Sequence, residues 1–124
     1  MRKILALCAL VLILGLAGAA LALKGASHFG AAFTGAPHVE VVDLLHRPEE
    51  YLNKQLTIEG TVSDQCALTG CFFHFRVGIE RLRIELGDLA EKIPQHAGTP
   101  VKVEGTLVHH GDSYEFLGTA VEFL

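Results

Sequence analysis

The segment from Leu56 to Val62 reads Leu-Thr-Ile-Glu-Gly-Thr-Val, and the segment from Val101 to Leu107 reads Val-Lys-Val-Glu-Gly-Thr-Leu. In each segment apolar residues alternate with polar ones, which is the pattern of a strand with one face in a core. A glycine interrupts each apolar row at the same place, as is typical of strands that bulge or coil around a small barrel. The two segments therefore predict two curved strands of a β-barrel.

Three further strands are predicted between and after these two. Two more alternating rows follow the first strand, joined by a turn at residues 78–80, and their inward residues are Phe73, Phe75, Val77, Leu82, Ile84 and Leu86. A last strand is expected from Ser113 to Phe123, after a turn at residues 110–112. Both faces of this last strand carry apolar residues, so the alternation does not predict its register.

Two short helices complete the predicted elements. Val42, Leu45 and Leu52 lie at near-helical spacing, and Pro48 between them is tolerated as the first residue of a new helical turn. We expect a short N-terminal helix with a break at residues 46–48. A second short helix is expected from Gly87 to Ile93, where Pro94 ends it.

Three strands, a short helix and two more strands follow the order of the five-stranded oligonucleotide/oligosaccharide-binding (OB) barrel. The chain resembles small exported bacterial domains of this type, which are related to the anticodon-binding-like barrels. The resemblance covers residues 40–123 and rests on 44–52, 56–62, 70–72 and 101–107. It implies an all-β, Greek-key OB-fold in a class of exported domains that has no single established function.

The N-terminus predicts export. Arg2 and Lys3 precede 20 uncharged, mostly apolar residues from Ile4 to Leu23. Such a run is typical of a signal peptide or a membrane anchor. Residues 20–22 offer a small-x-small cleavage pattern, whereas at about 1.5 Å per residue the run also matches a hydrocarbon core of roughly 30 Å. Both interpretations of residues 1–23 stay open.

Either interpretation delivers the remainder outside the cytoplasm, as a periplasmic domain or one anchored in the inner membrane and facing the periplasm or exterior. Residues 24–38 are rich in Gly and Ala and show no periodicity, so we expect a flexible linker there. Residues 39–124 are expected to form the single OB-fold domain.

The charge of the exported part argues against nucleic acid as a partner. Without Arg2 and Lys3, eight of the ten Lys and Arg residues remain against 14 Asp and Glu, a formal charge of −6. A small ligand or another envelope protein is the expected partner. The outer face of the second and third strands would carry an aromatic and cationic patch of Phe72, His74, Arg76, Arg81 and Arg83. Alternatively, Glu80 and Glu85 neutralise a merely solvated surface there.

Cys66 and Cys71 lie in the loop between the first two strands. In an exported protein the simplest interpretation is a disulfide, since the two ends of a hairpin can meet the required separation. The alternative is a zinc or copper site in which the cysteines meet His109 and His110 from the loop between the last two strands. Strand alternation places His74 on the opposite face from Cys71, which disfavours it as a third ligand.

One short motif suggests a haem carrier. His110 and Tyr114 match the H-x3-Y pattern of the exported haem chaperones of cytochrome c maturation, which are membrane-anchored barrels of this class. The resemblance implies that His110 would attach haem, with Tyr114 as its neighbour.

No catalytic signature frames the hydroxyl and carboxylate pairs at residues 63–64 and 112–113. The sequence therefore predicts a non-enzymatic, exported or membrane-tethered OB-fold binding module that needs no cofactor. The alternative function is a zinc, copper or haem carrier built on the cysteine loop with His109 and His110.

Overall fold

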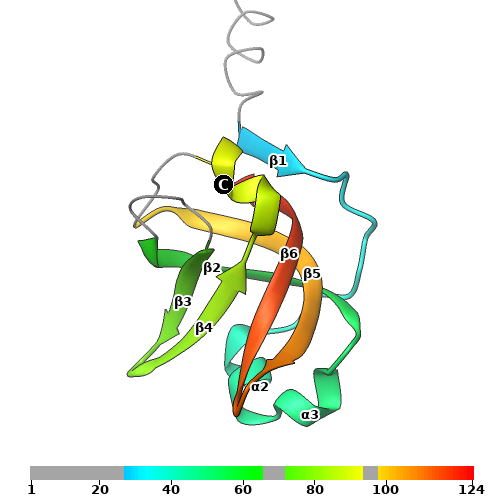
Figure 1. The fold of residues 1–124 in the computed structure, drawn as a ribbon, viewed down its shortest axis with the longest axis vertical. Coiled ribbons are helices and arrows are strands. Elements are labelled where there is room, and N and C mark those ends of the chain that lie inside the picture. Colours follow the sequence, from blue (N-terminus) through cyan, green and yellow to red (C-terminus); the bar gives the residue numbers. More distant parts are fainter. Residues whose placement is uncertain (1–26, 66–71, 94–97) are drawn as a thin grey trace, which may run out of the picture.

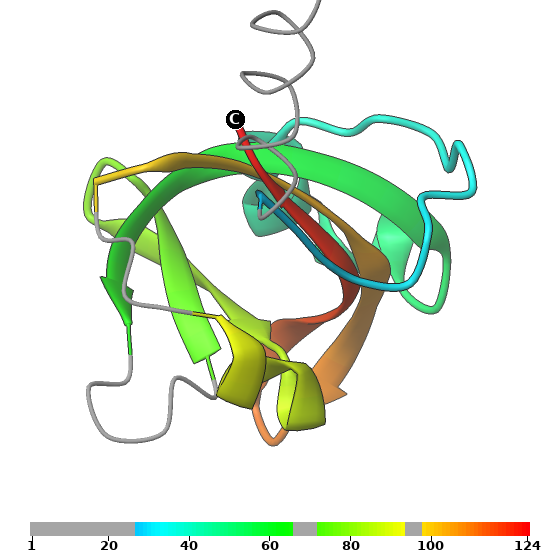
Figure 2. The ribbon, with the colours of Figure 1, turned by 90° about the horizontal axis from the view of Figure 1, so that it is seen from above.

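Five strands curve into a closed barrel (Figures 1 and 2). The computed structural model describes residues 27–65, 72–93 and 98–124. The barrel strands are β2 (Gln55–Gln65), β3 (Phe72–Val77), β4 (Glu80–Glu85), β5 (Pro100–His110) and β6 (Ser113–Phe123). Strand β2 pairs with β5 through Thr61 and with β3 from Val62 onward, so one long strand joins two parts of the barrel.

The pairing confirms the predicted OB-fold. Neighbouring barrel strands are antiparallel except β4 and β6, which run parallel, and the β5–β6 pairing closes the barrel. The inward rows read from the sequence are buried in one core, with Val77 partly exposed at its edge. The barrel-strand residues of that core are Leu56, Ile58, Val62, Phe73, Phe75, Leu82, Ile84, Val101, Val103, Leu107, Phe116 and Val121.

The predicted helices cover the two ends of the barrel (Figure 1). Helices α2 (Val41–His46) and α3 (Pro48–Tyr51) confirm the broken N-terminal helix, with the break at Arg47. Val41 and Leu44 of α2 are buried against the lower end. The helix between β4 and β5 is a 3-10 helix, η2 (Gly87–Lys92), and Ile93 after it is buried at the upper end.

The two strand glycines have different roles. A Cβ on Gly105 would lie 1.9 Å from the carbonyl oxygen of Leu117, so β6 approaches β5 more closely than a side chain allows. A bulge occurs beside Gly105, as expected. In β2 the irregularity lies between Val62 and Asp64 rather than at Gly60, which instead leaves room for the ring of Phe75.

Residues ahead of the helices form an additional strand. Strand β1 (His28–Gly30) pairs antiparallel with the end of β6, and the ring of Phe29 packs edge-on against Phe123 at 5.9 Å. Farther along, the backbone N–H and C=O of Thr57 bond to Pro37 and Val39, both at 2.9 Å. We call residues 28–39 the strap, which runs down one side of the barrel in Figure 1.

The strap corrects one prediction. Residues 28–38 of the expected flexible linker are attached to the barrel, because their backbone groups bond to β2, β5 and β6. Backbone pairing of this kind needs no apolar periodicity, so no sequence pattern indicated it. The predicted leader at residues 1–23 lies outside the described residues. Among the residues that are described, no helix is long and apolar enough to cross a membrane.

A buried carboxylate holds the middle of the strap. Glu104 of β5 is only 1% exposed, although its side chain is on the outer face of the barrel. It accepts hydrogen bonds from the backbone N–H and hydroxyl of Thr34 at 2.8 to 3.1 Å, from the N–H of Ala36 at 3.3 Å and from Gln55 at 3.3 Å. Burial raises the pKa of Glu104, but these hydrogen bonds outweigh it, so the pKa lies below its ordinary value.

We therefore expect Glu104→Gln to lower the free energy of unfolding by about 1 to 3 kcal/mol at pH 7, since the amide cannot accept all of these bonds. Because the folded-state pKa is depressed, the stabilisation by Glu104 is complete above the ordinary pKa of 4.5 and is lost as the pH falls through the folded-state value. Urea unfolding at several pH values measures both effects. The exposed Glu59→Gln is the control; equal stability of the two variants would contradict the assignment.

Candidate functional site

The outward residues of β3 and β4 form an exposed face on the side of the barrel away from the strap (Figures 1 and 2). Phe73 and Phe75 of β3 are buried, so the residues that alternate with them, Phe72, His74 and Arg76, point outward. The structure places all five predicted ligand-face residues here, and we call them the β3–β4 face: Phe72, His74, Arg76, Arg81 and Arg83.

A row of charged side chains crosses this face. The registers align Asp64 of β2, His74 of β3, Arg83 of β4 and Glu115 of β6. His74 Nδ1 lies 2.6 Å from Asp64 Oδ1, and Arg83 Nε lies 3.7 Å from Glu115 Oε2. The imidazole of His74 and the guanidinium of Arg83 therefore each approach a carboxylate from a strand outside the β3–β4 hairpin.

Arg83 also stacks on an aromatic ring. Its guanidinium lies 4.1 Å from the ring centroid of Phe72, and its Nη2 lies 2.8 Å from Glu85. This pair agrees with the expectation that Glu85 neutralises the face. Glu80 instead approaches His46 of α2, at 3.5 Å.

The charges of the other two arginines are less fully offset by carboxylates. Arg76 and Arg81 are directly opposite one another, an arrangement of like charges that is unfavourable by itself. Arg81 reaches Asp64 at 3.2 Å, whereas Arg76 has no ion pair among the described residues. Burial raises the pKa of Asp64, but its bonds to His74 and Ser63 and the charge of Arg81 hold it below its ordinary value.

The hydroxyls here are not arranged for nucleophilic attack. Ser63 Oγ donates to Asp64 at 3.3 Å and to the carbonyl of His74 at 3.0 Å, rather than to an imidazole nitrogen. Ser113 Oγ donates to the carbonyl of His110 at 2.9 Å across the β5–β6 turn. The cationic groups and the ring of Phe72 suit recognition of a planar anion such as a carboxylate.

The predicted histidines of the β5–β6 hairpin have separate partners. The ring of His109 lies 4.9 Å from that of Tyr114, whose hydroxyl donates to Glu49 of α3. This hydrogen bond raises the pKa of Tyr114. His110 Nδ1 instead lies 3.5 Å from Glu115. Thus His109, rather than His110, contacts the tyrosine of the H-x3-Y motif.

Cys66 and Cys71 lie outside the described residues, between the end of β2 and the start of β3. Among residues 27–65, 72–93 and 98–124, no group of three or more His, Cys, Asp or Glu side chains is arranged to hold a metal ion. The disulfide, metal and haem assignments stay predictions.

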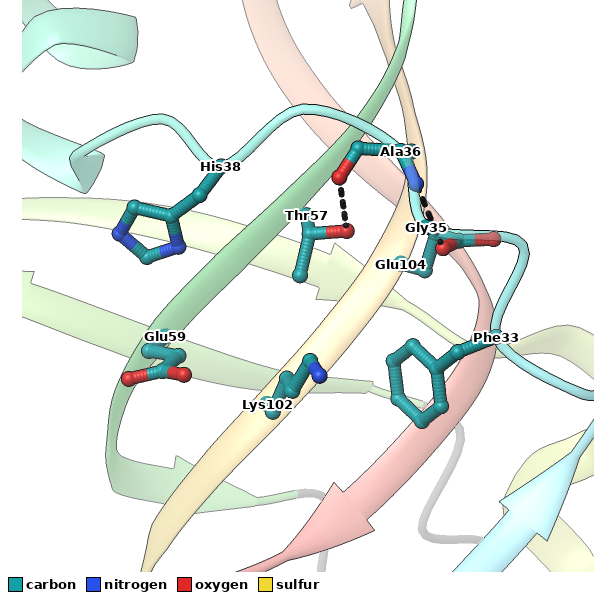
Figure 3. A pocket seen from close by; sticks show the side chains of 8 residues that line it. All are labelled: Phe33, Gly35, Ala36, His38, Thr57, Glu59, Lys102 and Glu104. Carbon is teal, nitrogen blue, oxygen red and sulfur yellow. Dashed lines mark hydrogen bonds between the residues drawn. The ribbon is translucent and has the colours of Figure 1, made fainter.

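The sequence did not point to the pocket beside the strap (Figure 3). This pocket, of about 230 Å³, has Phe33 and His38 on the strap side and Glu59 and Lys102 on the barrel. The ammonium of Lys102 lies 4.7 Å from the ring centroid of Phe33. Docking of the strap brings Phe33 and His38 beside the paired residues Glu59 and Lys102. Neither the sequence of the strap nor that of the two strands shows this contact by itself.

No protein-family model matches the sequence, and no curated protein matches it. Solved structures do match. A candidate aspartyl-tRNA synthetase from Leishmania major Friedlin aligns with a TM-score of 0.59 and 22% identity over 86% of this chain and 25% of that one. The hypothetical protein ygiW from E. coli aligns with a TM-score of 0.53 and 9% identity over 74% of this chain and 100% of that one.

The chain thus spans a quarter of the synthetase and the whole length of ygiW. At these identities the likeness shows the fold, and the recognition of an OB-fold barrel is confirmed. This architecture is typical of binding modules.

Proposed function

We propose that this protein is a non-enzymatic binding module of the cell envelope whose β3–β4 face takes a small ligand bearing a carboxylate, either free or on a partner protein. The observation that carries the proposal is the guanidinium of Arg83 stacked on Phe72, with Arg81 beside it, on the side of the barrel that the strap leaves uncovered. A guanidinium held flat by an aromatic ring presents its donors in a fixed plane, which matches a carboxylate.

The charge balance of the face favours a small anion over a polyanion. Asp64, Glu85 and Glu115 contact the cationic side chains of this face and offset their charge. A nucleic acid needs a continuous set of uncompensated cations along its backbone. A single carboxylate needs only one guanidinium, with Arg81 or His74 as a second donor.

Export and tethering are part of the proposal and rest on the leader-like residues 1–23. Outside the cytoplasm, Cys66 and Cys71 would form a disulfide. Because the loop that holds them joins Gln65 to Phe72, closing it would restrict the start of β3 beside the β3–β4 face.

To test the disulfide, we would compare the intact mass of protein from its native compartment before and after reduction. The expected result is a gain of about 2 Da on reduction, with no bound metal. Stoichiometric zinc or copper retained by protein with reduced cysteines would contradict the disulfide and favour the carrier function.

To test the ligand face, full-length protein in a neutral detergent would be titrated with N-acetylglycine and, as a neutral comparison, N-acetylglycinamide. We expect saturable amide shifts in β3 and β4 with the carboxylate only, and about tenfold weaker binding in Arg83→Ala, because a charge-assisted hydrogen bond is lost.

The matched control is Arg47→Ala, which removes a guanidinium at the break between α2 and α3, away from this face. Equal amide shifts with N-acetylglycine and N-acetylglycinamide would overturn the assignment of the ligand face. An equal loss of affinity in Arg83→Ala and Arg47→Ala would overturn it as well.

A further inference from the structure

The strands β2 and β3 separate at one point of the barrel (Figure 1), and a groove lies between the helix α2 and these strands. Their pairing begins at Val62 and Phe75, so the preceding residues of β2 have β5 on one side and no β3 partner on the other. The groove has a volume of about 270 Å³ and is lined by Glu40 and the first two residues of α2, by residues 59–61 of β2 and by residues 75–77 of β3. We call it the β2 groove.

The edge of β2 in this groove presents backbone hydrogen-bonding groups. Successive residues of a strand direct their N–H and C=O to alternate sides. Thr57 directs both groups away from β5, where Pro37 and Val39 of the strap bond to them. Two residues farther on, Glu59 directs its groups to the same side, between the end of the strap and the start of the β3 pairing. No described strand pairs with Glu59 there.

The groove carries charges that the protein leaves unbalanced. Lys102 lies opposite Glu59 on β5, but its ammonium is turned toward Phe33, so Glu59 has no ion pair among the described residues. The carboxylate of Glu40 pairs, among the described residues, with His38 alone, at 3.3 Å, and both side chains are exposed. A neighbouring hollow of about 330 Å³ is also lined by Glu40 and residues 59–61, so both carboxylates border both hollows.

Apolar surface lies next to these carboxylates. Val42 is 37% exposed, Val77 is partly exposed, and both line the groove. The ring of Phe75 packs directly beneath Gly60, where a Cβ would lie only 2.7 Å from it, and is itself buried. The groove therefore combines apolar side chains, a strand edge, the two carboxylates and one guanidinium, that of Arg76.

We infer that the β2 groove binds a short extended peptide segment that carries a lysine or arginine side chain next to an apolar one. The peptide backbone would bond to the β2 edge at Glu59, its cationic group would lie between Glu40 and Glu59, and its apolar side chain would contact Val42 and Val77. This site shares Arg76 with the β3–β4 face but includes neither Phe72 nor Arg83, and its two carboxylates outnumber the one guanidinium, so it favours a cation.

The test uses full-length protein in a neutral detergent and the capped peptide acetyl-Val-Lys-Val-amide, followed by amide shifts and calorimetry. We expect saturable shifts at residues 59–61 and 76–77, and binding that weakens as salt is added. Glu59→Gln, an exposed substitution, should weaken binding about threefold to fivefold. Glu50→Gln on α3 is the matched control and should leave binding unchanged.

Two comparison peptides separate the contributions. The glutamate analogue acetyl-Val-Glu-Val-amide tests charge, and a lysine peptide with a methylated central backbone nitrogen tests the strand edge; both should bind more weakly. Arg83→Ala should not change binding of the lysine peptide, so failure of the ligand face would not affect this result. Equal binding of all three peptides, shifts confined to β3 and β4, or no shifts at millimolar lysine peptide would overturn the inference.

Discussion

The hydrogen bonds of the Glu104 carboxylate hold the strap against the barrel, and the arrangement of the rest of the surface depends on them. The carboxylate is buried on the outer side of β5 and accepts hydrogen bonds from Thr34 and Ala36, which lie about 70 residues away in the sequence. A charge in such a place is tolerated only when hydrogen bonds replace its lost water, and the strap supplies most of them. The strap is also held by its backbone bonds to Thr57, by the pairing of β1 with β6 and by Phe29 and Val39, which pack against the core.

Docking of the strap divides the surface of the barrel. It covers the outer side of β5 and the start of β2, and β1 adds to the end of β6, whereas β3 and β4 remain open (Figures 1 and 2). The same docking brings Glu40 and His38 to the edge of β2 and so completes the β2 groove. The two proposed sites thus differ in charge, because guanidinium groups predominate on the β3–β4 face and the groove has two carboxylates beside Arg76.

The sequence predicted those parts of the fold that alternation encodes. Four inward rows, both short helices and the order of strands were read from local patterns, because each pattern reports which face of one element is buried. The register of β6 could not be read, because a bulge at Thr119 places Phe116 and Val121 on the same inner face although an odd number of positions separates them. The strap escaped prediction because its contacts are backbone bonds to distant residues. The candidate site could be predicted only in part for the same reason. Alternation within one strand placed Arg81 and Arg83 on one face, but the pairing register between strands, which the sequence does not show, brings Asp64 and Glu115 beside them.

The central claim is that the strap is a fixed part of the barrel, held by Glu104. Hydrogen exchange of the Thr34 and Ala36 amides in the full-length protein tests it most directly, because these N–H groups donate to the buried carboxylate. We predict that both amides exchange at least about a hundredfold more slowly than in an unstructured peptide, near the rate of barrel amides such as that of Val103. Exchange at the unstructured rate while Val103 stays protected would contradict the claim.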